Sequence, residues 1–195
     1  MTSLAAAEVV VLGGGLSKFA PARPDGTPVE WIVEAAQAAL IDGGVELETV
    51  QHSVVAYESE IMARQLSWGQ VVQDTLALCP RPTVRVEGGG ASGGVALRTA
   101  LAYLRGGLCE SILVAGADAV GRQVPSSTVR RVYAMSGDVD FEMAAGGFFI
   151  AYYALMMQEH MRRYGTREDH MALVSVKNHR NARSNAMAAM PLDLT

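Results

Sequence analysis

A run of small residues between a β-branched segment and a helical one constrains the fold of this chain most strongly. Residues 82–86 are rich in β-branched side chains, residues 87–94 are mostly glycine, and residues 91–105 have a helical pattern. A strand that turns through glycines into a helix directs free backbone N–H groups and the positive helix end at the turn. Such a turn favours an anion, an oxyanion or a thiolate as its occupant.

Apolar runs and helical patterns alternate along the first part of the chain. This order is typical of βαβ units and predicts an α/β fold with a largely parallel sheet. The run at residues 111–116 is apolar throughout, which predicts a central strand buried on both faces. The predicted strands are residues 8–12, 53–57, 83–87 and 111–116, and the predicted helices are residues 28–41, 70–78 and 91–105.

The pattern changes in the last third of the chain. Residues 121–140 are polar, with basic side chains in the middle, and we expect them to be irregular. Two helices are predicted after them, over residues 148–164 and 167–183. We therefore expect an α/β core at residues 1–119 and a helical excursion, or loop domain, at residues 120–195.

The composition favours a protein that associates with other proteins. Half of the 195 residues are hydrophobic and 18% are charged, so we expect the excess apolar surface to form an interface. No apolar run is long enough for a membrane span, and the N-terminus lacks the pattern of a signal peptide. The net charge of −4 argues against nucleic acid as a partner. Cys79 and Cys109 form neither a disulfide framework nor a zinc site, which favours a reducing, cytoplasmic location and predicts no metal.

The glycine-rich turn matches a dinucleotide-binding pattern in form. Gly88, Gly90 and Gly93 satisfy G-x-G-x-x-G between a strand and a helix, and Asp118 follows the next predicted strand. That pattern normally follows the first strand of a sheet, whereas two predicted strands precede it here. The sequence favours a P-loop even less than a dinucleotide site, because no Gly-Lys-Ser/Thr follows the glycines. Close packing of the helix on the strand explains the glycines without any ligand.

The complete amino-acid sequence of this segment is more specific than its glycine pattern alone. Residues 86–97, Val-Glu-Gly-Gly-Gly-Ala-Ser-Gly-Gly-Val-Ala-Leu, resemble the nucleophile turn of the sterol-carrier-protein-type branch of the thiolase superfamily. The resemblance continues over residues 102–107, 112–118, 164–166 and 176–182. It covers nearly the whole chain as the N-terminal half of a thiolase. It implies a mostly parallel or mixed sheet covered by helices, with a helical loop domain.

The resemblance also implies a chemistry, and the chain departs from it at one position. Thiolases transfer acyl groups between coenzyme A thioesters, and a cysteine thiolate at the start of a helix accepts the acyl group. Gly90 stands at the position of that cysteine. Ser92 is a substitute candidate, although helix capping or packing explains it more simply. Gly88 and Gly89 would lie against the substrate.

Two groups of residues in the loop domain also match the family. Met143 corresponds to the segment that lines the acyl pocket, and Glu142 beside it is either an acid/base group or a solvated carboxylate. Arg122, Arg130 and Arg131 are candidates to contact the phosphates of coenzyme A, unless they belong to a solvated basic loop. The family's second cysteine and its histidine motifs, which lie in its C-terminal half, have no counterpart here.

Three functions remain open from the sequence. The first is a component of a thiolase-type acyltransferase of lipid metabolism that lacks its nucleophile. The second is a retro-aldol lyase, since some thiolase-like proteins carry glycines at this turn and need no cysteine. The third is a non-catalytic partner subunit. In each case the resemblance implies an acyl-CoA thioester as substrate or ligand and no covalently bound cofactor. It also implies a hetero-oligomer with a second polypeptide that carries the C-terminal half, or self-association.

Overall fold

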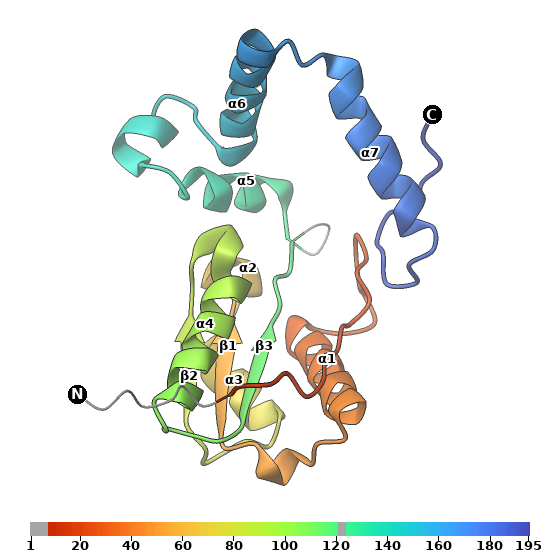
Figure 1. The fold of residues 1–195 in the computed structure, drawn as a ribbon. Helices are drawn as coiled ribbons and strands as arrows, with labels where there is room; N and C mark the ends of the chain where they lie inside the picture. The colour runs from red at the N-terminus through yellow and green to blue at the C-terminus, as the bar shows by residue number, and fades with distance from the viewer. Residues whose placement is uncertain (1–7, 121–123) are drawn as a thin grey trace, which may run out of the picture. The chain divides into compact units, whose positions relative to one another are not determined.

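The structure, a computed structural model, describes residues 8–120 and 124–195 (Figure 1). The described residues form two compact units. Residues 8–17 and 24–119 form the core unit, and residues 18–23, 120 and 124–195 form the helical unit. None of the described helices is long and apolar enough to cross a membrane.

A parallel sheet of three strands lies at the centre of the core unit. The strands are β1 (His52–Ala56), β2 (Thr83–Val86) and β3 (Ile112–Gly116), and their order is β2-β1-β3. Val54 of β1 lies opposite Val84 of β2 and Val114 of β3. The predicted α/β class, with a parallel sheet covered by helices, is confirmed.

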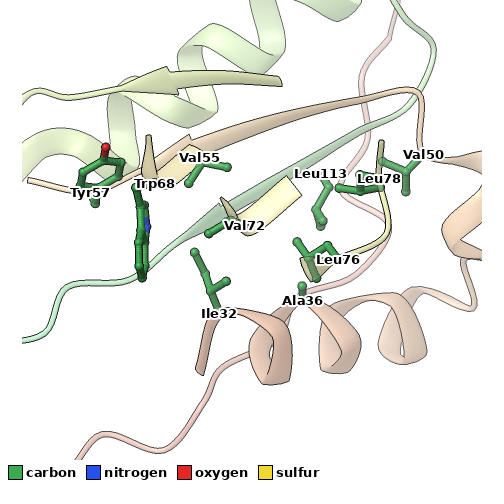
Figure 2. Packing of buried hydrophobic residues seen from close by; sticks show 10 residues of the cluster. All are labelled: Ile32, Ala36, Val50, Val55, Tyr57, Trp68, Val72, Leu76, Leu78 and Leu113. Atoms are coloured by element: carbon green, nitrogen blue, oxygen red, sulfur yellow. The ribbon is translucent and has the colours of Figure 1, made fainter. Parts of the chain in front are cut away.

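Alternate residues of β1 face two different cores. Val54 and Ala56 pack with Ala96 and Ala100 of α4 (Ser92–Arg105). Val55 points to the opposite face, because side chains alternate along a strand. Figure 2 shows the cluster on that face, which joins the sheet to α1 (Pro28–Gly43) and α3 (Trp68–Thr75) and contains Ile32, Ala36, Val50, Val55, Tyr57, Trp68, Val72, Leu76, Leu78 and Leu113.

The ends of α1 show how local sequence fixes a helix. The Thr27 hydroxyl accepts a hydrogen bond from Glu30 N, and the Glu30 carboxylate accepts one from Thr27 N, which is a capping box. Pro28 occupies the first turn, where its missing N–H costs nothing. Gly44 ends the helix with a φ of 60°, a left-handed conformation that glycine adopts without strain. The prediction of this helix is confirmed.

Two predictions about strands are wrong. Residues 111–116 do not hold the central position, because β1 pairs with strands on both sides and β3 with β1 alone among the described strands. Leu113 packs in one core and Val114 in the other, so helices bury both faces of β3 without a second neighbouring strand.

Residues 8–12 form no strand, and Val11 is 87% exposed. The chain passes along α1 instead, where Gly14 N donates to the Asp42 carboxylate at 3.0 Å. A Cβ on Gly13 would lie 2.5 Å from Ala39 O, so glycine permits this close approach.

The helical unit contains α5 (Ser126–Ala134), a π-helical turn (Val139–Met143), α6 (Phe149–Tyr164) and α7 (Glu168–Ala182). The predicted helices over residues 148–164 and 167–183 are confirmed within two residues at each end. The expectation that residues 121–140 are irregular is wrong for α5. Val129, Val132 and Tyr133 share one face of α5 at helical spacing, and the two arginines between them hide that pattern in the sequence.

The core unit contains two shorter elements as well. A 3-10 turn (Leu47–Thr49) precedes β1, and the short helix α2 (Glu60–Ala63) follows β1. Ser59 caps α2, since its hydroxyl accepts a hydrogen bond from Ile61 N at 3.1 Å.

Candidate functional site

The glycine turn joins β2 to α4 as the sequence predicts. β2 ends at Val86, a short 3-10 turn covers Gly89–Ala91, and α4 begins at Ser92. The turn therefore lies at the carboxyl end of a parallel strand and at the N-terminus of a helix. In α/β folds this edge of the sheet is where ligands bind.

The three consecutive glycines of the turn have different structural needs. A Cβ on Gly88 would lie 2.8 Å from Val95 Cγ2, so packing requires glycine there. Gly89 has a φ of 56°, which is strained for other residues. A Cβ on Gly90 would meet no atom within 4 Å, and the φ of Gly90 is not positive. The backbone at residue 90 therefore accepts a side chain that the sequence does not supply.

The hydroxyl of Ser92 closes the turn. It donates to Gly89 O at 2.7 Å and accepts from Gly88 N at 3.0 Å, and the residue is 7% exposed. Because the hydroxyl hydrogen already has an acceptor, this geometry favours a role in shaping the turn over a role as nucleophile. A catalytic role for Ser92 stays a prediction.

Most backbone N–H groups of the turn are used inside it. Gly88 N bonds to Ser92, Gly89 N donates to the Glu87 carboxylate, and Ala91 N donates to Gly88 O. The N–H of Gly90 is not among these bonds. Together with the positive end of α4, it makes a small site that favours negative charge, whereas the Glu87 carboxylate on the neighbouring N–H opposes it.

Acidic side chains follow the other two strands at the same edge of the sheet. Both carboxylate oxygens of Asp118 lie within hydrogen-bond distance of Glu58 N, at 3.2 and 3.3 Å. Partial burial raises the pKa of Glu58, and the negative charges of Asp118 and Glu87 raise it further. A carboxyl group with a raised pKa transfers protons more readily near neutral pH. The sequence analysis missed Glu58, and its place after the predicted strand 53–57 was the available signal.

A groove of about 370 Å³ lies in the helical unit. It brings together Met143 and two of the arginines that the sequence predicts near a substrate, whereas Arg122 lies outside the described residues. Thioether, phenyl and guanidinium groups in one groove suit a ligand with an apolar part and an anionic part. The lining residues are Arg130, Arg131, Ala134, Met143, Gly146, Gly147 and Phe148.

Glu142 does not line this groove. Its carboxylate accepts a hydrogen bond from Asp138 N at 2.8 Å, and the Asp138 carboxylate accepts one from Phe141 N at 2.7 Å. These bonds stabilise the π-helical turn that carries Met143. Burial raises the pKa of Tyr152, and the charge of Glu142 adds to this effect. The acid/base role of Glu142 stays a prediction.

No group of three or more His, Cys, Asp or Glu side chains among the described residues is arranged to hold a metal ion.

Comparisons with known proteins agree with the family resemblance of the glycine turn. No family model matches the chain. The chain is 32% identical over 190 residues to the acetyl-CoA acetyltransferase of Methanothermobacter thermautotrophicus. This match covers 96% of the chain and 48% of that protein. It is 26% identical over 186 residues to the sterol carrier protein 2 of Gallus gallus, covering 91% of the chain and 33% of that protein. The chain thus spans about half the length, or less, of the curated relatives it matches.

A solved structure has the same fold. The structure described as "Ltp2-ChsH2(DUF35) aldolase" matches with a TM-score of 0.66 and 18% identity, over 91% of this chain and 44% of that one. At this identity the match shows the fold alone. The sequence relatives support a place for the chain in the thiolase superfamily, in the branch related to sterol carrier protein 2, and the solved structure shows the fold.

Proposed function

We propose that this chain binds acyl-CoA thioesters as a component of a thiolase-like acyltransferase and forms no covalent acyl-enzyme by itself. One observation carries the proposal. The turn has room and a suitable backbone for a side chain at residue 90, and that residue is glycine. The relatives named acetyl-CoA acetyltransferase support the choice of substrate.

The proposal assigns roles to the two candidate regions. At the turn, Gly88 and Gly89 let the backbone curve beside the ligand, and the Gly90 N–H donates to the thioester oxygen. The groove of the helical unit is a separate candidate region, in which Met143 would contact an apolar group of a ligand and Arg130 and Arg131 would contact phosphate groups. Arg–phosphate contacts are strong because both partners are charged.

The proposal also assigns partners. Because α6 and α7 carry exposed apolar residues and no buried ones, we propose that this chain associates with a second polypeptide, or a second copy, which supplies the remaining groups for acyl transfer. A cytoplasmic location, a role in lipid metabolism and the domain boundary near residue 119 are further parts of the same proposal.

Restoring the thiol tests the proposal. In a Cys79→Ser background, which removes the exposed native thiol, Gly90→Cys protein is incubated with acetyl-CoA and analysed by intact mass spectrometry. We expect one acetyl group to be added, because a thiol at this helix N-terminus ionises readily. Gly94→Cys is the matched control, since a Cβ at Gly94 also meets no atom within 4 Å.

The control separates a specific site from general thiol reactivity. Acetylation of the Gly90→Cys protein well above that of the Gly94→Cys protein and of the background protein supports the proposal. A folded Gly90→Cys protein that is acetylated no faster than the Gly94→Cys protein contradicts it.

A second candidate function is a retro-aldol lyase, and the raised pKa of Glu58 at the same edge of the sheet favours it. Here Glu58 would take the proton of a β-hydroxyl on an acyl-CoA, and the Cα–Cβ bond would break. The electron pair would form an enolate held by backbone N–H groups, and protonation of its carbon would give a shorter acyl-CoA and a carbonyl compound.

Cleavage of a β-hydroxyacyl-CoA, followed by detection of both products, tests this second candidate. We expect Glu58→Gln to abolish cleavage and Glu110→Gln, before β3 at the opposite edge of the sheet, to leave it unchanged. Cleavage that survives Glu58→Gln contradicts the role of Glu58. If neither acylation nor cleavage occurs while acyl-CoA still binds, the chain is a non-catalytic binding subunit.

A further inference from the structure

The register of the sheet sets three segments side by side at its carboxyl edge. Ala56 ends β1 and pairs with the last residue of β2 and with the last residue of β3. Two residues further along come Gly88 after β2, Glu58 after β1 and Asp118 after β3. Because β1 lies between the other two strands (Figure 1), the chain leaves the sheet at Glu58 between the glycine turn and Asp118.

Asp118 holds the backbone of Glu58 from the side of β3. The Asp118 carboxylate accepts from Glu58 N, which lies 3.2 Å from Oδ1 and 3.3 Å from Oδ2. This contact joins the segment after β1 to the segment after β3, and it restricts where the Glu58 side chain can lie. A carboxylate accepts such a bond more strongly than an amide oxygen would, and it also places a negative charge beside Glu58.

The charge of Asp118 acts on the carboxyl group of Glu58 as well. Burial raises the pKa of Glu58, and among the neighbouring charges Asp118 raises this pKa more than Glu87 does. Glu60 of α2 is paired with Arg85 of β2, with Nη1 and Oε1 2.7 Å apart. In return, the bond from Glu58 N favours the ionised form of Asp118, whose pKa is raised by burial. The contact therefore couples the backbone and the proton affinity of Glu58 to one side chain.

We propose that Asp118 is a positioning residue that holds Glu58 beside the glycine turn and strengthens it as a base. A nearby negative charge disfavours the ionised form of Glu58, so a proton that Glu58 takes up is held more tightly. The inference rests on the second candidate function, in which Glu58 takes the proton of a β-hydroxyl group. Asp118 acts through Glu58 and has no contact with the substrate in this account.

Two variants separate the two actions of Asp118. Asp118→Asn keeps an oxygen that can accept from Glu58 N but removes the charge, whereas Asp118→Ala removes both. Asp42→Asn is the matched control, because the Asp42 carboxylate accepts a comparable bond from Gly14 N at 3.0 Å. Carbon-13 NMR of the side-chain carboxyl groups gives the pKa of Glu58, and hydrogen exchange gives the protection of its N–H. Both are measured on the full 195-residue chain without substrate, and circular dichroism checks that each variant is folded.

The two variants should differ in one of these measurements. We expect both to lower the pKa of Glu58 by at least about half a unit, because both remove the charge. We expect Asp118→Ala alone to speed exchange at the Glu58 N–H, by at least about tenfold, because that N–H loses its acceptor. Asp42→Asn should change neither property. An unchanged pKa of Glu58 in the two Asp118 variants, unchanged exchange in Asp118→Ala, or an equal pKa change in Asp42→Asn would each overturn the proposal.

Cleavage of a β-hydroxyacyl-CoA separates this inference from the function on which it rests. We expect Asp118→Asn to move the acid limb of the pH profile of kcat/KM to lower pH and to leave KM nearly unchanged, because the limb reports the base. An acid limb that stays in place would overturn the proposal. If the NMR and exchange results are as expected and the wild-type chain cleaves no β-hydroxyacyl-CoA, the second candidate function fails while the action of Asp118 on Glu58 is supported.

Discussion

The core unit and the helical unit differ in how they bury their apolar residues. In the core unit, ten buried residues from the sheet, α1, α3 and the loops pack into one cluster, and a second cluster lies under α4. In the helical unit, neither α6 nor α7 has a buried residue, although Leu155 and Leu173 are each 62% exposed. The core unit builds two apolar clusters of its own, although side chains such as Val11 and Leu97 stay exposed. The helices α6 and α7 of the helical unit instead carry exposed apolar side chains and no buried ones, so their apolar faces are suited to another surface.

Truncation of buried and exposed side chains gives the largest test of this difference. Trp68 is 1% exposed, and Trp68→Ala should lower the free energy of unfolding by about 3–5 kcal/mol. Leu173→Ala in α7 should change it by less than about 0.5 kcal/mol. Urea unfolding followed by circular dichroism measures both. Similar losses for the two variants would show that α7 is buried and would break the comparison.

Removal of a hydroxyl gives the next largest effect. Ser92→Ala should lower the free energy of unfolding by about 1–3 kcal/mol, because Gly88 N and Gly89 O lose their bonds to a buried group. Ser184→Ala in the helical unit removes only an exposed bond to Asn181 O and should have little effect. The same urea experiment compares them. An unchanged stability of the Ser92→Ala protein would remove the role of this hydroxyl in the turn.

Alanine at each glycine of the turn sharpens the account of the core unit. Gly88→Ala should cost about 1–3 kcal/mol through overlap with Val95, and Gly89→Ala about 1 kcal/mol through its positive φ. Gly90→Ala should be neutral or stabilise the protein slightly, because open space surrounds it. Thermal unfolding ranks the three variants. If Gly90→Ala lowered the stability of the protein as much as Gly88→Ala does, the claim that residue 90 accepts a side chain would be contradicted.

The smallest predicted effect concerns pH: the contributions of Glu58 and Glu159 to folding stability change with pH in opposite directions. The pKa of Glu58 is raised by burial, so the folded state binds its proton more tightly and this contribution to stability falls as pH rises through the raised pKa. The pKa of Glu159 is lowered by hydrogen bonds from Arg162 and Arg163, so its contribution is present above the ordinary carboxyl pKa and is lost as pH falls.

Variants measure the two signs separately. Glu58→Gln should flatten a fall in stability between the ordinary carboxyl pKa and neutral pH, and Glu159→Gln should flatten a fall toward acid pH. Unfolding free energies at a series of pH values provide the test. The same sign of change in both variants would contradict these assignments.

Local signals in the sequence were sufficient where the cause is local. The capping box of Thr27 and Glu30 and the left-handed Gly44 fix α1 within a few residues of the chain. Residues 8–12 form no strand because the segment lies along α1 instead, and the bond from Gly14 N to the Asp42 carboxylate beside it joins residues 28 positions apart. The pattern of α5 was hidden by Arg130 and Arg131, which lie between its apolar residues.

The candidate site was predictable only where it depends on residues that are neighbours in the sequence. The glycine turn is continuous in sequence, and its strand, turn and helix are where the sequence places them. The contact of Asp118 with Glu58 joins residues that are 60 positions apart, and no spacing in the sequence indicates it. The groove that contains Met143 and Arg130 likewise depends on packing between separate segments.

The central claim of the proposed function is that the turn before α4 is a preformed site for negative charge at Gly90, the position that the proposal assigns to the missing nucleophile. The most direct measurement is the thiol pKa of the Gly90→Cys protein, obtained from the pH dependence of alkylation in the Cys79→Ser background. The account predicts a pKa at least about one unit below that of Leu97→Cys, which lies further along the same helix, because the field of a helix end is limited to its first turn. Equal pKa values for the two thiols would contradict it.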